Sequence, residues 1–112
     1  MDFKTLENKV KEITLKTQPD YSIKSKRELE ILAKTVKLTE EVGELCNDVL
    51  GILKMQRKSK LDKFDKENIY QEFADVVISV MSLAGSAGVD LERAITDKLT
   101  KIEDRAKKEK RI

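Results

Sequence analysis

The chain is short and mixed in character: it has 112 residues, of which 39% are charged and 39% hydrophobic, and its formal net charge is +2. This length suits one domain with a thin core, and the near-neutral charge gives no general reason to expect a nucleic-acid partner. The single cysteine and the absence of histidine exclude a disulfide framework and the usual zinc sites. Any metal or acid–base chemistry therefore has to use carboxylates, lysine or arginine.

No targeting or membrane-spanning segment is expected. The N-terminal residues 1–4 do not begin an apolar signal core, and no apolar run has the length needed to cross a bilayer. A lone cysteine fits a reducing compartment. We therefore expect a cytoplasmic protein without a membrane partner.

The apolar pattern begins with two predicted helices. An N-terminal helix ends before Pro19, because the residue before a proline avoids helical backbone angles. Residues 18–25 form a loop, and a longer helix runs from about Lys26 to Met55. The two apolar stripes are formed by Phe3, Leu6, Val10 and Ile13, and by Leu38, Val42, Leu45, Val49, Ile52 and Leu53.

Two more helices are predicted in the C-terminal half. The basic connection at residues 56–64 is interpreted as a solvated loop, with a functional lid as the alternative. Asp65 is a candidate N-cap for a third helix over about residues 66–87, and Asp90 can cap a fourth that runs toward Arg105. We expect an all-α, four-helix, bundle-like subunit in a single domain. Its expected parts are an N-terminal helix and loop (1–25), functional helices (26–106) and a frayed tail (107–112).

Acidic residues interrupt the apolar surroundings of the second and third helices. Each residue advances about 100° around a helix, so Glu41 and Glu44 share one flank, whereas Glu40 lies further toward solvent. The third helix is apolar around most of its circumference, which predicts that it is buried. One polar strip breaks this pattern and is formed by Asn68, Glu72, Asp75, Ser79, Ser82 and Ser86. Two acids on a buried helix predict a polar cavity with room for a ligand.

These carboxylates need cationic partners if apolar surroundings hold them. Salt bridges to lysine or arginine would satisfy each acid separately, and short acidic patterns arise by chance in a chain with 21 acidic residues. A short connection would instead place the two helices antiparallel and bring both clusters together, where ionised carboxylates repel one another. Oxygen ligands without histidine favour Mg²⁺ or Mn²⁺ as the ion between them.

The fourth helix carries two cations in or beside its apolar stripe, Lys98 and Arg105. Two interpretations stay open. In the first, the aliphatic stems cover apolar surface while the charged heads remain in water. In the second, the heads contact the phosphates of a bound nucleotide.

The acidic motifs resemble those of a known family. Residues 40–44 (Glu-Glu-Val-Gly-Glu) and 72–75 (Glu-Phe-Ala-Asp) resemble the Glu-Glu-x-x-Glu and Glu-x-x-Asp motifs of the MazG-like, all-α nucleoside triphosphate pyrophosphohydrolases, and the likeness extends over about residues 26–106. The resemblance implies Mg²⁺-dependent hydrolysis of a (deoxy)nucleoside triphosphate to the monophosphate and pyrophosphate, in a homodimer or homotetramer. By motif position it implies metal ligands at Glu41, Glu44, Glu72 and Asp75, a water-orienting or water-deprotonating Glu40, and phosphate contacts from Lys98 and Arg105.

The sequence departs from the family pattern at one position and leaves two other functions open. Ile102 stands where the family often carries asparagine, which affects one substrate contact. Phosphoribosyl-ATP pyrophosphohydrolases share the fold and similar motifs, but they tend to carry a histidine after the second motif, and this chain has none. A non-catalytic helical interaction module is the third possibility, and it predicts no Mg²⁺ dependence and no pyrophosphate release.

Overall fold

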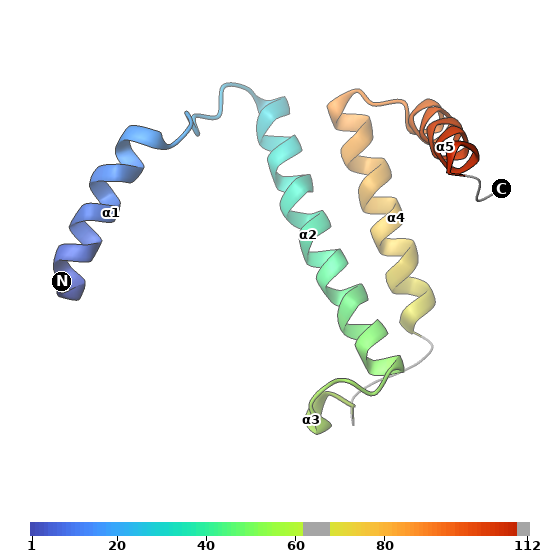
Figure 1. The fold of residues 1–112 in the computed structure, drawn as a ribbon, viewed down its shortest axis with the longest axis horizontal. Coiled ribbons are helices and arrows are strands. Elements are labelled where there is room, and N and C mark those ends of the chain that lie inside the picture. The colour runs from blue at the N-terminus through green and yellow to red at the C-terminus, as the bar shows by residue number, and fades with distance from the viewer. Residues whose placement is uncertain (62–67, 110–112) are drawn as a thin grey trace.

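The structure, a computed structural model, describes residues 1–61 and 68–109 and is all-α, as the sequence predicts. No strand occurs in these two ranges. Figure 1 shows two long antiparallel helices side by side, with one further helix at each end of the chain. The elements are α1 (Phe3–Thr17), α2 (Lys26–Ile52), the one-turn α3 (Lys58–Leu61), α4 (Asn68–Ala87) and α5 (Leu91–Lys108).

Three helices begin at side chains that accept a hydrogen bond from a backbone N–H three residues further on. Asp2 caps α1 in this way, Ser25 caps α2, and Asp90 caps α5 as predicted. Each cap satisfies one of the backbone donors that a helix leaves free at its first turn. The predicted cap at Asp65 and the predicted helix start at Lys66 lie outside the described residues.

The C-terminal ends of α2 and α4 are set by residues with left-handed backbone angles. Gly88 has a φ of 73°, and the N–H of Val89 donates to the carbonyl of Ala84, which closes α4 in a Schellman motif. Lys54 has a φ of 56° and closes α2 in the same manner. This turn ends α2 three residues before the predicted Met55.

Two further boundaries differ from the sequence-based expectation. The connection expected as a loop contains α3, although residues 62–67 lie outside the described part. Helix α5 continues to Lys108, past the expected start of the frayed tail at residue 107. Basic residues in its last turn favour this extension, because they interact well with the negative end of the helix dipole.

Helices α2 and α4 pack through two facing stripes whose members alternate at spacings of three and four residues. This is the spacing of helices that pack side by side with interlocking side chains. Every member is buried or half-buried. The stripes are Ile31, Lys34, Leu38, Glu41, Leu45 and Asp48 on α2, and Ile69, Glu72, Val76, Ser79, Leu83 and Ser86 on α4. We call these two stripes the inner seam.

Polar contacts hold one end of the inner seam together. The ammonium of Lys34 donates to the hydroxyl of Ser86 over 2.5 Å and to the carbonyl of Ser82 over 3.4 Å. The guanidinium of Arg27 donates to the carbonyl of Ser86 over 3.0 Å. These bonds join the N-terminal half of α2 to the end of α4 and so fix the register of the two helices.

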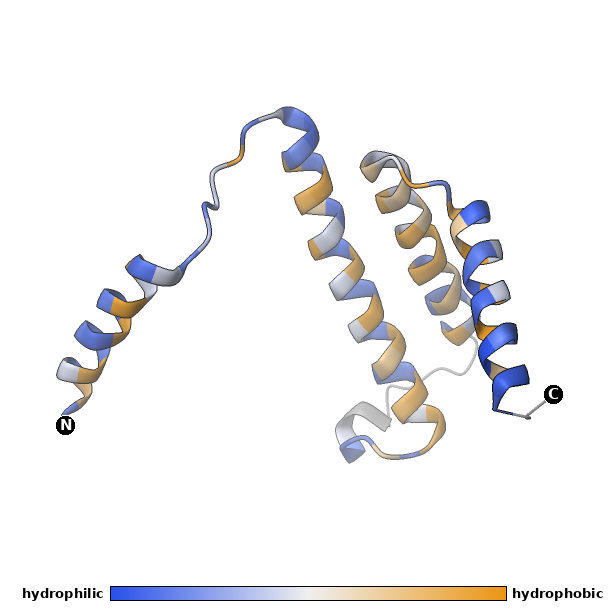
Figure 2. Cartoon of the chain, turned by 45° about the horizontal axis from the view of Figure 1, so that its top comes forward, coloured by the Kyte–Doolittle hydropathy of each residue, from blue (hydrophilic) through white to orange (hydrophobic). Residues whose placement is uncertain are grey.

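The prediction that the third helix is buried is wrong for a single chain. Figure 2 shows that α4 is largely apolar, yet Phe73, Val77 and Ile78 remain 53%, 56% and 61% exposed. Only α2 packs closely against α4 in the described part of the chain, so the opposite face of α4 has no cover.

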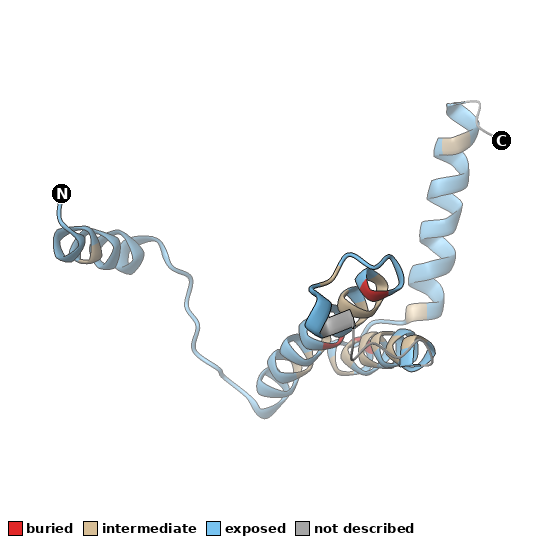
Figure 3. Cartoon of the chain, turned by 90° about the horizontal axis from the view of Figure 1, so that it is seen from below, coloured by how far each residue is buried: buried red, intermediate tan, exposed pale blue. Residues whose placement is uncertain are grey.

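The chain as a whole exposes far more surface than a compact monomer. Its accessible surface is 9744 Å², whereas a compact protein of 12.8 kDa exposes about 6,300 Å². Its radius of gyration is 20.7 Å, against about 13 Å for a compact domain of this length. The excess arises because α1 and α5 extend away from the α2–α4 pair, as Figure 3 shows.

Helix α5 turns away from α4 through 107°. Among the described residues, no single helix has the length and apolar character to cross a membrane, although α4 and α5 pass that test as a bent pair.

Candidate metal centre

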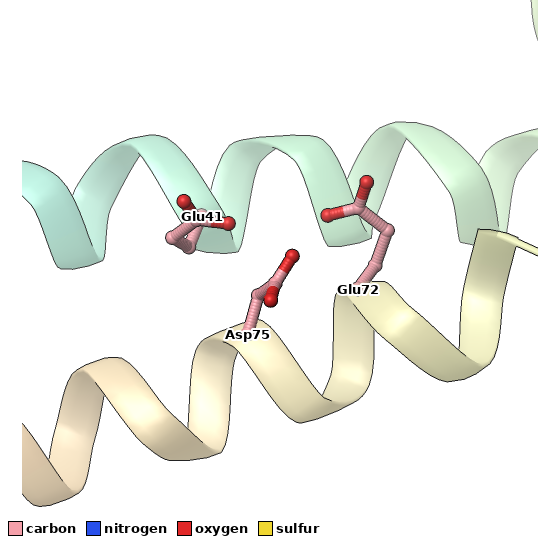
Figure 4. A group of neighbouring side chains, drawn as sticks. All are labelled: Glu41, Glu72 and Asp75. Atoms are coloured by element: carbon pink, nitrogen blue, oxygen red, sulfur yellow. The ribbon is translucent and has the colours of Figure 1, made fainter.

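Three carboxylates converge between the two long helices. Glu41 projects from α2 toward α4, while Glu72 and Asp75 project from α4 toward α2 (Figure 4). One oxygen from each of the three lies within 4.8 Å of the others. Glu72 and Asp75 can both face α2 because residues three apart share a helix face. The convergence of acids from two helices, predicted from the sequence, is therefore present.

Burial makes these charges costly. Glu41 is only 8% exposed, and Glu72 is half-buried, whereas Asp75 is exposed. The Oε2 atoms of Glu41 and Glu72 are buried and have no hydrogen-bond partner. Buried polar atoms are almost always paired in folded proteins, so two unpaired carboxylate oxygens facing one space need a cation or a proton.

The electrostatics at Glu72 point in the same direction. Burial raises the pKa of Glu72 above its ordinary value of 4.5, and the negative charges of Glu44, Asp48, Asp75 and Glu41 raise it further. A carboxyl group in this position takes up a proton more readily than an isolated one. A divalent cation would relieve the same repulsion and hold Glu72 ionised.

Lys37 is a cation already present beside this group. Its ammonium lies 3.1 Å from Oε1 of Glu41 and 3.6 Å from Oε1 of Glu40. The hydrogen bond to Glu41, followed by the charges of Glu40 and Glu41, raises the pKa of Lys37. One oxygen of Glu41 is thereby satisfied and its direction fixed, while the other oxygen remains available.

A small open hollow lies between α2 and α4 beside Lys37, the residue that pairs with Glu41. It has a volume of about 180 Å³ and is lined by Lys34, Lys37, Ile78, Ser79 and Ser82. Two members of the predicted polar strip, Ser79 and Ser82, line this shallow space together with Ile78 on its α4 side, and the two lysines lie on its α2 side.

The donor set suits a hard divalent cation. The three converging groups are carboxylates, and the two unpaired oxygens of Glu41 and Glu72 supply the free lone pairs that an ion requires. Oxygen-only ligands favour Mg²⁺, Mn²⁺ or Ca²⁺ over zinc or copper. The residues of this centre therefore fit the divalent metal that the acidic motifs imply.

The other predicted site residues lie further out. Glu44 is exposed and is not one of the three converging acids, although its charge acts on Glu72. Glu40 is exposed and paired with Lys37. Lys98 and Arg105 are exposed on α5, and in the described part of the chain neither contacts the acidic group. Their predicted roles remain predictions.

Two residues of this region were not assigned a role from the sequence. Asp48 is half-buried on the inner seam, and its Oδ2 atom is buried without a partner. Lys37 holds Glu41 in position. The spacing of four and three residues through Glu41, Leu45 and Asp48 places Asp48 on the helix face of Glu41, and the four-residue spacing from Lys37 to Glu41 is typical of a helical ion pair.

Comparison with known families decides the assignment. The family model described as the MazG nucleotide pyrophosphohydrolase domain matches residues 30–109. The chain belongs to the MazG family. The matched range includes the three converging carboxylates, both acidic motifs and α5, whereas α1 lies outside it. No curated protein and no solved structure matches the chain.

Proposed function

We propose that this MazG-family chain hydrolyses (deoxy)nucleoside triphosphates to the monophosphate and pyrophosphate with the help of Mg²⁺, or of Mn²⁺ in its place. The observation that carries the proposal is the convergence of Glu41, Glu72 and Asp75 within 4.8 Å, with buried and unpaired oxygens on the two glutamates. Membership of the family supports the reaction class.

The acidic residues have distinct roles in this proposal. Glu41, Glu72 and Asp75 hold the ion, and Glu44 completes the set from the exposed side. Bound there, Mg²⁺ would supply positive charge that offsets the triphosphate and the departing pyrophosphate. Glu40 is exposed next to Glu41, where its carboxylate can orient the attacking water and accept its proton.

Phosphate contacts are assigned to Lys98 and Arg105, which a single chain holds away from the acids. Bringing them to the site requires either movement of α5 or a second copy, so a homodimer or homotetramer is part of the proposal. The large exposed apolar surface of α4 supports such an assembly. A cytoplasmic location remains a prediction, which cell fractionation tests.

The test is a panel of canonical and modified triphosphates, with phosphoribosyl-ATP included, assayed for pyrophosphate with Mg²⁺ and with EDTA. We expect Mg²⁺-dependent pyrophosphate from one or more nucleoside triphosphates. Glu41→Gln and Asp75→Asn should each lower kcat/KM by at least about 100-fold, because each removes a charge that holds the ion. Glu103→Gln, the same kind of change on α5, should retain the parental rate.

The alternatives give different results in the same assay. Pyrophosphate from phosphoribosyl-ATP alone would assign the second enzymatic function. No pyrophosphate from any compound would indicate a non-catalytic interaction module. Folded Glu41→Gln and Asp75→Asn variants that retain the parental rate would refute the site assignment.

A further inference from the structure

Helix α2 carries a second stripe with the spacing of the inner seam, displaced by two residues from it. We call it the outer seam. Its members recur at three and four residues, all are uncharged, and all are exposed. They are Leu29, Leu32, Val36, Thr39, Gly43, Cys46 and Leu50. Seven positions in this register form the kind of surface that packs against another helix.

The outer seam is apolar at its N-terminal end and lined by small residues further along. Leu29, Leu32 and Val36 are 51%, 49% and 61% exposed. At Gly43, an added Cβ atom would meet nothing within 4 Å in the described part of the chain. The seam is therefore open along its length, with room at its centre for large side chains.

Helix α1 carries a stripe of the same spacing, which we call the arm seam. No residue of α1 is buried, and Figures 1 and 3 both show this helix apart from the α2–α4 pair. Phe3 and Val10 are 73% and 54% exposed. The members of the arm seam are Phe3, Leu6, Val10, Ile13 and Thr17. Because α1 lies outside the matched range 30–109, the family match does not account for it.

Charge favours the arm seam over α5 as the cover of the outer seam. The arm seam and the outer seam are both uncharged. On α5 the comparable stripe through Leu91 and Ile95 includes Lys98 and Arg105. Packing this α5 stripe on the outer seam would remove the two cations from water without supplying an acidic partner, which is unfavourable.

The connection between α1 and α2 directs α1 away from its own chain. It begins at Gln18 and ends at Ser25 with extended backbone at both residues, and Pro19 stiffens its start.

The surface excess of about 3,400 Å² is also larger than the roughly 800 Å² per partner of an ordinary stable interface. Because the apolar face of α4 also lacks cover, packing α1 on its own chain would leave part of this excess exposed, and a second copy would cover more of it.

We propose that α1 is an exchanged arm whose seam packs on the outer seam of α2 in a second copy of this chain, each copy giving its arm to the other. The two-fold exchange makes a closed assembly, because the same two surfaces are used in both directions. This inference does not depend on catalysis: it holds or fails whether or not the chain hydrolyses triphosphates.

Isotope-mixed cross-linking tests the exchange. Unlabelled and ¹⁵N-labelled full-length chains are unfolded, mixed, refolded together and treated with a lysine-reactive cross-linker. The peptides of interest join Lys9 or Lys16 of α1 to Lys37 of α2 or to Lys54 in the turn after α2. We expect these links to include pairs with one labelled and one unlabelled peptide. If every α1–α2 link joins two labelled or two unlabelled peptides, α1 folds back on its own chain. If no α1–α2 link forms, the arm packs elsewhere. Either result overturns the proposal.

A matched pair of variants shows whether the apolar seam is responsible. Leu6 lies on the arm seam, whereas Leu15 is on the opposite side of α1 and 76% exposed. Leu6→Asp should abolish the mixed α1–α2 links and raise the dissociation constant in sedimentation equilibrium by at least about 100-fold, since each dimer loses two apolar contacts. Leu15→Asp introduces the same residue into the same helix and should change neither result. Equal behaviour of the two variants would refute the role of the seam.

Discussion

Replacing Glu72 by glutamine is expected to stabilise the metal-free protein and to remove its stabilisation by Mg²⁺. Glu72 is half-buried among four other acids, and its Oε2 atom has no partner. A neutral amide of nearly the same shape removes the repulsion but also one charge that attracts the ion. The same substitution therefore has opposite effects in EDTA and in Mg²⁺.

The size of the Mg²⁺ effect follows from linkage. An ion that binds only the folded state and is present at about 100 times its Kd stabilises that state by about 2.7 kcal/mol. For a chain of this length, that free energy raises the melting temperature by roughly 10 °C. Thermal unfolding followed by circular dichroism, at one fixed protein concentration, measures this shift for the parent protein.

Glu72→Gln should melt above the parent in EDTA and show little of the Mg²⁺ shift. Glu103→Gln on α5 is the control, and we expect it to retain the full shift because Glu103 lies outside the acidic group. If Glu72→Gln gains as many degrees from Mg²⁺ as the parent protein does, Glu72 does not hold the ion.

Three further predictions concern protonation, the resident cation and a helix end. Because the pKa of Glu72 is raised in the folded protein, its contribution to the free energy of unfolding is fully present below the ordinary value of 4.5 and is lost as pH rises through the raised pKa. The urea midpoint of the parent should therefore fall relative to that of Glu72→Gln as pH rises in EDTA. A difference between the two midpoints that does not change with pH would contradict this prediction. Lys37→Met removes a cation that repels an ion bound at Glu41, so Mn²⁺ affinity measured by calorimetry should rise about two- to fivefold; weaker binding would instead show that the positioning of Glu41 by Lys37 outweighs this repulsion. Gly88→Ala should lower the free energy of unfolding by about 1 kcal/mol, because a φ of 73° disfavours a side chain, while the added Cβ would make only an ordinary contact with Nη2 of Arg27 at 3.5 Å; unchanged urea unfolding would show that this turn is not constrained.

Apolar periodicity was enough to find the helices, because each long helix has a stripe at helical spacing. It did not define the inner seam, since Lys34, Glu41 and Asp48 occupy seam positions that an apolar pattern leaves out. Lys34 is tolerated there because it bonds to Ser86. Such compensation is a tertiary contact, and one sequence does not show which partner supplies it.

The end of α2 illustrates a second kind of difference. Nothing in the residue type of Lys54 indicates a left-handed backbone, since glycine or asparagine is usual at such a position. The turn therefore ended α2 earlier than the apolar stripe suggested. At Gly88, by contrast, the left-handed position that ends α4 is occupied by a glycine, the residue type usual there, and the helix ends at Ala87, as predicted.

The acidic motifs were recognisable because their members share helix faces, and Glu41, Glu72 and Asp75 do converge. The sequence did not show that Glu44 would lie outside this group of three. It also did not show that Lys98 and Arg105 would be held away from it by the turn between α4 and α5. That placement depends on a 107° change of helix direction, which residue spacing does not encode.

Diffraction from crystals grown with Mn²⁺, measured at the manganese absorption edge, tests most directly whether the carboxylates of α2 and α4 share an ion. We expect an anomalous peak between Glu41, Glu72 and Asp75, bonded to an oxygen of each, and no such peak in crystals of Asp75→Asn. Fully ordered side chains with no peak among them, or with manganese bound only elsewhere on the chain, would contradict the proposed metal centre.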